Sequence, residues 1–242
     1  DELKMHYQPQ ISIHQQFVNS VEALVRWQHP EVGLISPDRF ISLAENCNLI
    51  VPLTLWTLNT TLRHCKPFFD RSQDFCVSVN LSAVALHESD LVEMIRQSMQ
   101  IWGISPNNLT LEVTESAMMT DPESSMQRLH RLNDLGVNIS IDDFGTGHSS
   151  LAYLKQLPVN EIKIDKSFVM NMSENNEDRK IVRSVIDLGH NFGLQVVAEG
   201  IESEQTLSEL RGMGCDIGQG YYISRPLPMN ELLNWINTTT WN

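Results

Sequence analysis

Short runs rich in β-branched residues alternate with longer helical runs through most of this chain, regularly so from residue 75 onward. The predicted strands cover residues 75–80, 109–114, 138–142, 161–165, 194–199 and 216–223, and the predicted helices cover residues 89–102, 122–135, 149–156, 179–191, 204–213 and 230–236. The helix at 122–135 carries boundary signals: Asp121 as N-cap, Pro122 at its first position and Gly136 after its end. Repeated strand and helix units indicate a parallel sheet covered by helices, and 242 residues suit one (β/α)8 barrel.

The first quarter of the chain departs from this alternation. Residues 4–12 and 19–27 have the pattern of two consecutive strands with no helix between them, which predicts a hairpin-like entry with one antiparallel strand. Two helices are then predicted at residues 37–46 and 51–66. The predicted fold is therefore α/β, a single domain over residues 1–242 that forms a TIM-like (β/α)8 barrel with one antiparallel strand near the N-terminus.

Polar side chains occupy alternate positions of the predicted strands. In residues 109–114, Thr110, Glu112 and Thr114 share one face, while aliphatic residues share the other. Because helices cover the outside of a barrel, the aliphatic faces should point outward and the polar faces inward. Isolated buried charges are costly, so a polar interior indicates a bound cation and a substrate. The alternative is an internal ion-pair network around Lys163, which would neutralise one or two carboxylates and leave the other acids unpaired.

Eight polar residues lie where these strands end: Glu22, Asn80, Glu112, Asp142, Asp143, Lys163, Glu199 and Gln219. The acids and Asn80 offer hard oxygen ligands, which suit Mg²⁺ or Mn²⁺ better than zinc, and no histidine stands in an HExxH or paired spacing. Asp142 and Asp143 would point to opposite sides of a regular strand. Both can reach a metal only if the backbone turns there, and Gly145 and Gly147 are suited to such a turn.

This ligand set predicts phosphodiester hydrolysis. Two metal ions about 3.5–4 Å apart would bridge one water molecule, lower its pKa from ~15.7 toward neutrality and align it with a phosphorus atom. Glu199 is the candidate general base. Lys163 is the candidate for holding the nucleophilic water or neutralising charge that builds on the phosphate.

Composition limits the partners. The net charge of -13 argues against binding a nucleic acid polymer. The four cysteines lack CxxC spacing, so neither a zinc site nor a disulfide framework is indicated, and a reduced cytoplasmic setting is the simplest interpretation. No apolar run approaches the ~20 residues that cross a membrane, and no signal peptide is visible. The start of the chain, almost directly in a strand, suggests a domain cut from a longer multidomain protein.

Seven ordered blocks of sequence resemble the EAL-domain family. They are EALVRW from Glu22, VNLS around Asn80, LEVTES around Glu112, DDFGTG from Asp142, IKIDKSF around Lys163, VAEGIE around Glu199 and GCDIGQGYYISRP around Gln219. A single EAL tripeptide is common. The ordered match across nearly the whole chain is very specific.

The resemblance implies a bacterial cyclic di-GMP phosphodiesterase that uses Mg²⁺ or Mn²⁺ at a two-metal site and produces linear pGpG. It implies that Glu22, Asn80, Glu112 and Asp142 bind one metal, that Asp143 binds mainly the second, and that Gln219 organises the nearby water. On the substrate side it implies Leu24 in the EAL block, Arg26 for a phosphate, and Gln8, Glu202 and Tyr222 for the guanines. Glu115 would brace the loop at residues 143–150. A homodimer, N-terminal sensory or regulatory domains and a cytoplasmic location, either free or as part of a membrane-anchored protein, are also implied.

Simpler explanations exist for several of these residues. Arg26 could pair with a surface acid, Gln8 and Gln219 could be hydrogen-bonding residues of the barrel rim, and Tyr222 could belong to the core. His148 stands where the family usually has tyrosine, which raises the question of loop dynamics.

Other functions remain open. A catalytically silent cyclic di-GMP receptor or a protein-interaction module is the main alternative, although such members typically lose metal ligands, the base or the loop motif. An unrelated metal-dependent barrel hydrolase is the third possibility.

Overall fold

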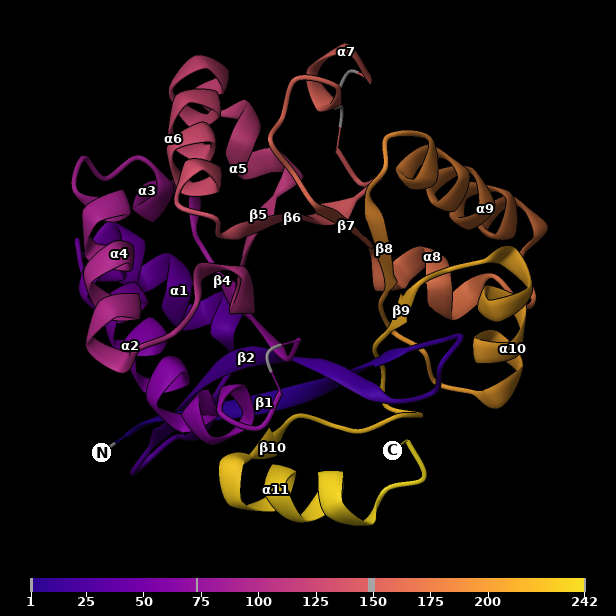
Figure 1. Ribbon diagram of the computed structural model, residues 1–242, viewed down its shortest axis with the longest axis horizontal. Coiled ribbons are helices and arrows are strands. Elements are labelled where there is room, and N and C mark those ends of the chain that lie inside the picture. The colour runs from indigo at the N-terminus through magenta and orange to yellow at the C-terminus, as the bar shows by residue number, and fades with distance from the viewer. Residues whose placement is uncertain (1, 73, 148–150, 242) are drawn as a thin grey trace.

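Eight strands close into a barrel in the computed structural model, which describes residues 2–72, 74–147 and 151–241 (Figure 1). In order around the barrel they are β1 (Leu3–Ser12), β2 (Val18–His29), β4 (Cys76–Asn80), β5 (Leu109–Thr114), β6 (Asn138–Phe144), β7 (Glu161–Ile164), β8 (Gln195–Ala198) and β9 (Ile217–Gly218). Strand β1 pairs antiparallel with both of its barrel neighbours, and the other barrel pairs are parallel. The predicted barrel with one antiparallel strand near the N-terminus is confirmed.

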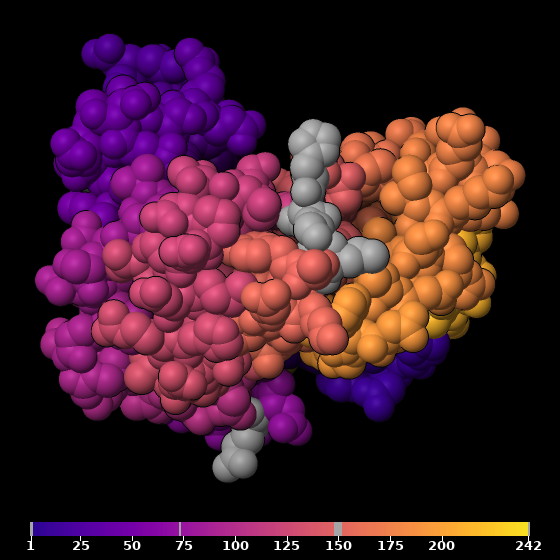
Figure 2. Space-filling model, turned by 90° about the horizontal axis from the view of Figure 1, so that it is seen from above, coloured from indigo at the N-terminus to yellow at the C-terminus, as the bar shows by residue number. Residues whose placement is uncertain are grey.

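Helices surround the barrel on its outside (Figure 1). The longer ones are α1 (Pro37–Asn46), α2 (Ile50–Phe69), α4 (Leu91–Trp102), α6 (Pro122–Asp134), α9 (Asn176–Asn191), α10 (Glu204–Met213) and α11 (Met229–Thr238). Shorter ones are α3 (Ala83–Leu86), the 3₁₀ turn η1 (Pro106–Asn108), α5 (Glu115–Met119), α7 (Leu151–Leu154) and α8 (Lys166–Asn171). In the space-filling view, the early indigo part and the later orange part of the chain project at opposite ends of the face, with the middle of the chain between them (Figure 2).

Most predicted elements agree with the structure, and the predicted boundary signals of α6 are confirmed. The Asp121 side chain accepts a hydrogen bond from the Ser124 amide, Pro122 occupies the first turn, and Gly136 has a φ of 88°. Two short strands were not predicted: β3 (Gly33–Ile35), which pairs with β2, and β10 (Leu227–Pro228), which pairs with β1.

Two predicted elements need correction. The strand predicted at 216–223 is limited to Ile217–Gly218, because the Ile223 and Ser224 amides both donate to the Gly220 carbonyl and the chain turns there. The helix predicted at 149–156 ends at Leu154, and its first two residues lie outside the described ranges. Short helices such as α3 and α5 were missed because four or five residues are too few to show helical periodicity.

As predicted, the aliphatic faces of the strands point outward to the helices and the polar faces point into the barrel. Ile139, Ile141 and Ile162 are buried in the hydrophobic core between the strands and the helices. Ser140 and Lys163, which alternate with them along β6 and β7, are also fully buried. Polar residues therefore fill part of the space that branched aliphatic residues occupy in an ordinary barrel.

Helix α9 packs unusually close to the barrel at Gly189. A Cβ atom built at this position would lie 2.5 Å from Val196 Cγ2 and 3.0 Å from Ile162 Cδ1. Gly212 in α10 is a helical glycine without this restriction, because nothing in the described chain lies within 4 Å of the corresponding position.

These two glycines make a matched test of the packing. We expect Gly189→Ala to lower the free energy of unfolding by about 1–3 kcal/mol through overpacking, despite the better helix propensity of alanine. Gly212→Ala should raise it by about 0.5–1 kcal/mol, since only propensity changes. Urea unfolding of both variants and the wild type measures the difference. Equal effects of the two substitutions would show that α9 does not pack as described.

Candidate active site and metal centre

A cavity of about 1120 Å³ opens at the carboxyl ends of the parallel strands. Glu22, Asn80, Asp142, Asp143 and Glu199 line it, so residues from β2, β4, β6 and the end of β8 meet there. Active sites of (β/α)8 barrels lie at this end. The predicted grouping of these polar residues at one end of the barrel is therefore what the structure contains. Glu22 was predicted at a strand end, but it lies within β2, which continues to His29.

Lys163 lies beneath the cavity at the centre of a carboxylate cluster. Its Nζ is 2.7 Å from Glu199 Oε1, 2.8 Å from Glu112 Oε2, 3.3 Å from Asp142 Oδ1 and 3.6 Å from Glu22 Oε2. The side chain is fully buried. Burial alone would lower the pKa of Lys163, but the surrounding carboxylates raise it well above its ordinary value, so the ammonium stays charged. The ion-pair network considered as an alternative does exist, and it joins one cation to four acids.

One ammonium cannot neutralise four carboxylates. Burial, followed by the charge of Glu22, raises the pKa of Glu112 well above its usual range. Burial also raises the pKa of Glu199 to about 7, although Lys163 opposes the shift. Burial and the neighbouring Asp142 raise the pKa of Asp143 to about 6. The cluster therefore holds surplus negative charge, which protons or a cation must balance.

Glu22 behaves differently from these three acids. Burial favours its protonated form, but Lys163 and the hydrogen bonds from Gln219 and Asn80 outweigh burial and lower its pKa. Asn80 Nδ2 donates to Glu22 Oε1 at 2.8 Å, and Gln219 Nε2 donates to Glu22 Oε2 at 2.6 Å. Glu22 is thus held as a carboxylate in a fixed orientation.

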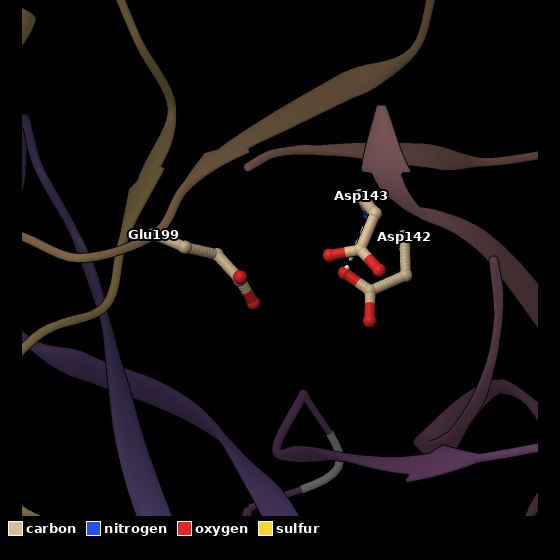
Figure 3. A group of neighbouring side chains, drawn as sticks. All are labelled: Asp142, Asp143 and Glu199. Atoms are coloured by element: carbon tan, nitrogen blue, oxygen red, sulfur yellow. Dashed lines mark hydrogen bonds between the residues drawn. The ribbon is translucent and has the colours of Figure 1, made fainter. Parts of the chain in front are cut away.

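A β-bulge brings the adjacent acids Asp142 and Asp143 to the same side. The register between β6 and β7 shifts between Ile141 and Phe144, so these two acids stand opposite the single residue Lys163. Asp143 itself adopts a left-handed conformation with a φ of 54°. The predicted backbone turn is therefore made at Asp143, with Gly145 following at a φ of 97°. Figure 3 shows both carboxylates facing the space that Glu199 enters from the opposite side.

The donor set fits a hard divalent cation. One oxygen each from Asp142, Asp143 and Glu199 lies within 4.8 Å of the others, so these three acids could hold a metal ion. Glu112 Oε1 is buried and has no hydrogen-bond partner in the described part of the chain, which leaves it available as a ligand. The amide nitrogen of Asn80 is used by Glu22, so its oxygen is the atom it can offer. Carboxylate and amide oxygens are the ligands that Mg²⁺ and Mn²⁺ prefer.

Six residues were predicted on the substrate side once Gln219 is included with its water network, and five of them line the cavity: Gln8, Leu24, Arg26, Glu202 and Gln219. Arg26 Nη1 donates to the Val25 carbonyl at 2.9 Å. Tyr222 is not among the lining residues, and its ring packs edge-on against Trp241 with centroids 6.5 Å apart. Its neighbour Tyr221 lines the cavity instead, with the Arg225 guanidinium 4.2 Å from the ring centroid.

Glu115 lies beside the segment that follows Asp143. Its Oε2 accepts hydrogen bonds from the Gly145 amide at 3.2 Å and the Gly147 amide at 3.3 Å. These contacts are the kind that a loop-bracing residue makes. His148, and with it the question of loop dynamics, lies outside the described residues.

The sequence interpretation missed one buried polar residue of the site. Gln10 is 2% exposed, and its Nε2 donates to Gln219 Oε1 at 2.7 Å. Its position two residues after Gln8 on β1 places both side chains on the same strand face, and this parity was the available signal.

A family model described as the EAL domain matches residues 1–226. The bifunctional diguanylate cyclase/cyclic di-GMP phosphodiesterase MucR of Pseudomonas aeruginosa is 41% identical over 233 residues, which cover 96% of this chain and 34% of that protein. The cyclic di-GMP phosphodiesterase NbdA of the same organism is 42% identical over 233 residues, covering 96% of this chain and 30% of that protein. The chain thus spans about a third of the length of these curated relatives.

Solved structures agree closely with this fold. A c-di-GMP complex of the PaMucR phosphodiesterase has a TM-score of 0.92 at 41% identity, covering 96% of this chain and 94% of that chain. The EAL enzyme Bd1971 with cAMP and cyclic di-GMP has a TM-score of 0.93 at 34% identity, covering 98% of this chain and 65% of that chain. Among the described residues, no helix has both the length and the apolar character needed to cross a bilayer.

The raised pKa values of Glu199 and Asp143 predict a pH-dependent metal affinity. A carboxyl with a pKa of about 7 is mostly protonated at pH 6 and mostly ionised at pH 8, and a metal must displace that proton. We expect the Mn²⁺ affinity to rise about 10- to 20-fold from pH 6 to pH 8, as measured by isothermal titration calorimetry. Glu199→Gln should reduce this rise, while Glu112 and Asp143, whose pKa values burial also raises, retain part of it. A wild-type affinity that is constant over this range would contradict the electrostatic description.

Proposed function

The chain belongs to the EAL-domain family, and from this membership we propose that it hydrolyses cyclic di-GMP to linear pGpG, which ends a bacterial second-messenger signal. The observation that carries the proposal is the cluster of Asp142, Asp143 and Glu199, which lines a large cavity beside the buried Lys163. The cavity volume of about 1120 Å³ lies just above the usual range of about 300–1,000 Å³ for small-molecule pockets, which suits a ligand as large as a dinucleotide. MucR and NbdA, the relatives named above, are cyclic di-GMP phosphodiesterases.

The proposed reaction is hydrolysis of one P–O3′ bond. Mg²⁺ or Mn²⁺ ions, held by Glu22, Asn80, Glu112, Asp142 and Asp143, would supply Lewis-acid activation of the water and the phosphate. The oxygen of water bonds to phosphorus, the bond from phosphorus to the 3′ oxygen breaks, and the 3′ oxygen takes up a proton. Glu199 accepts the proton that the water loses, and bound metal ions favour the ionised form of Glu199 that this role requires.

Lys163 and the cavity residues have supporting roles in this proposal. Lys163 holds Glu199 Oε1 at 2.7 Å and Glu112 Oε2 at 2.8 Å, which orients the base and a metal ligand together. Its predicted contact with the water or the phosphate requires that one of its donors be released from a carboxylate. Arg26 lines the cavity, where its planar fork matches phosphate oxygens. Gln8 and Glu202 line it as the proposed guanine contacts.

The wider setting is also part of the proposal. We place the domain in the cytoplasm, as a homodimer that works with N-terminal sensory or regulatory domains. The greater length of the curated relatives supports the additional domains. Two implied assignments, Tyr222 as a guanine contact and Glu115 as the brace of the loop at 143–150, are retained on the family resemblance, and the contacts of Glu115 with Gly145 and Gly147 support the second.

Replacing the proposed base, Glu199, distinguishes an enzyme from a receptor that binds cyclic di-GMP without cleaving it. We expect Glu199→Gln to lower turnover by about 10²- to 10⁴-fold, because the proton of the attacking water loses its acceptor. Cyclic di-GMP binding should stay within a few-fold of wild type. Product formation with Mn²⁺ is followed by chromatography of pGpG, and binding by calorimetry.

Glu204→Gln is the matched control, since this exposed glutamate in the first turn of α10 is not among the cavity-lining residues. It should leave both turnover and binding unchanged. Wild-type binding without any product under Mg²⁺ and Mn²⁺ would overturn the proposal in favour of the receptor. Absence of both binding and turnover would favour an interaction module.

A further inference from the structure

The antiparallel strand β1 carries two glutamines into the barrel interior. In its register with β2, Gln8 pairs with Glu22 and Gln10 pairs with Ser20. Because β1 runs opposite to the other barrel strands, each step along it leads away from the cavity. Gln8 therefore lines the cavity, while Gln10 lies deeper and is 2% exposed.

These side chains form a directed series of hydrogen bonds. Ser20 Oγ donates to Gln10 Oε1 at 2.7 Å, and Gln10 Nε2 donates to Gln219 Oε1 at 2.7 Å. Gln219 Nε2 then donates to Glu22 Oε2 at 2.6 Å and to Gln8 Oε1 at 3.0 Å. The four residues Ser20, Gln10, Gln219 and Glu22 are all at least nine-tenths buried.

The hydrogen bonds of this series allow only one orientation of the Gln219 side-chain amide, with its nitrogen toward Glu22 and its oxygen toward Gln10. An ionised Glu22 can only accept hydrogen bonds, so it requires the NH₂ group of Gln219 to face it. The opposite orientation of this amide would place its oxygen against the Glu22 carboxylate and its nitrogen against the Gln10 nitrogen. Both contacts are repulsive, and the Gln10 side chain, which is 2% exposed and does not line the cavity, could not turn to water instead.

We propose that Gln10 is a positioning residue that fixes the amide of Gln219, so that a single NH₂ group orients both the metal ligand Glu22 and the cavity residue Gln8. The inference rests on the proposed function, since it takes Glu22 as a metal ligand. Partners that orient first-layer metal ligands commonly contribute 10- to 100-fold to metal affinity. Ser20 anchors the series by supplying the hydrogen bond that turns the Gln10 oxygen away from Gln219.

A double-mutant cycle on metal affinity tests the proposal. The dissociation constant for MnCl₂ is measured by calorimetry for wild type, Gln10→Leu, Gln219→Leu and the double variant, without any nucleotide. We expect Gln10→Leu to weaken Mn²⁺ binding about 10-fold. If Gln10 acts through Gln219, the double variant should bind Mn²⁺ no more weakly than Gln219→Leu alone.

Asn108→Leu is the matched control for general destabilisation. Asn108 is buried to a similar extent and donates to the Phe75 carbonyl at 2.8 Å, in the turn that precedes β5 at the opposite end of the barrel. This variant should be destabilised yet bind Mn²⁺ as wild type does. If Gln10→Leu does not fold, Ser20→Ala removes the anchor with a smaller change and should weaken binding about 2- to 5-fold.

The outcomes separate the two proposals. Wild-type affinity in Gln10→Leu, or effects of Gln10→Leu and Gln219→Leu that multiply in the double variant, would overturn the positioning role and leave the proposed function intact. Failure of the wild type to bind Mn²⁺ would instead overturn the metal site, and the positioning role with it.

Discussion

The site is organised around one buried ammonium that faces more negative charge than it can neutralise. Lys163 lies within 3.6 Å of oxygens from four carboxylates that come from different parts of the barrel. A buried ion pair is stable only when the charges and hydrogen bonds on both sides are satisfied. Here the charge of Lys163 is fully balanced, whereas the four carboxylates together carry more negative charge than Lys163 neutralises. The cluster is therefore suited to accept a divalent cation. The same contact that stabilises the barrel interior thus leaves the site ready for a metal.

Strand direction has an equally specific consequence. In a fully parallel barrel, residues further along a strand approach the catalytic end, whereas β1 runs the other way. Along β1 the inward-facing residues therefore lead away from the cavity: Gln8 lines it, and Gln10 lies deeper in the barrel. This places Gln10 under Gln219, which in turn holds Glu22. The antiparallel strand closes the barrel between β2 and β9 and also supports Glu22, the proposed metal ligand, through Gln10 and Gln219.

Much of this arrangement could be predicted from the sequence, because strand parity and the common position of strand ends are local rules. They predict that Glu22, Asn80 and Asp142 lie at one end of the barrel, where all three line the cavity. The sequence suggests an ion-pair network around Lys163 with one or two carboxylates as an alternative, but the convergence of four acids could not be predicted, since it depends on the stagger of strands around the closed barrel. A backbone turn at the two adjacent acids was predicted, but the β-bulge and the left-handed conformation of Asp143 that make it were not, because a bulge is defined by the register with β7 rather than by composition. Parity with Gln8 places Gln10 on the inward face of β1, but its hydrogen bonds to Gln219 and Ser20 were needed to show what it contacts.

Titration of the carboxyl groups in the metal-free protein tests most directly whether Lys163 leaves surplus negative charge. Carbon-detected NMR of labelled Asp and Glu side chains reports each pKa with and without saturating Mg²⁺. The account predicts that Glu199 titrates near pH 7 without metal, that Lys163→Met moves this titration to higher pH, and that Mg²⁺ moves it to lower pH. A Glu199 carboxyl that titrates near its ordinary value of about 4.3, with no change on adding Mg²⁺, would contradict it.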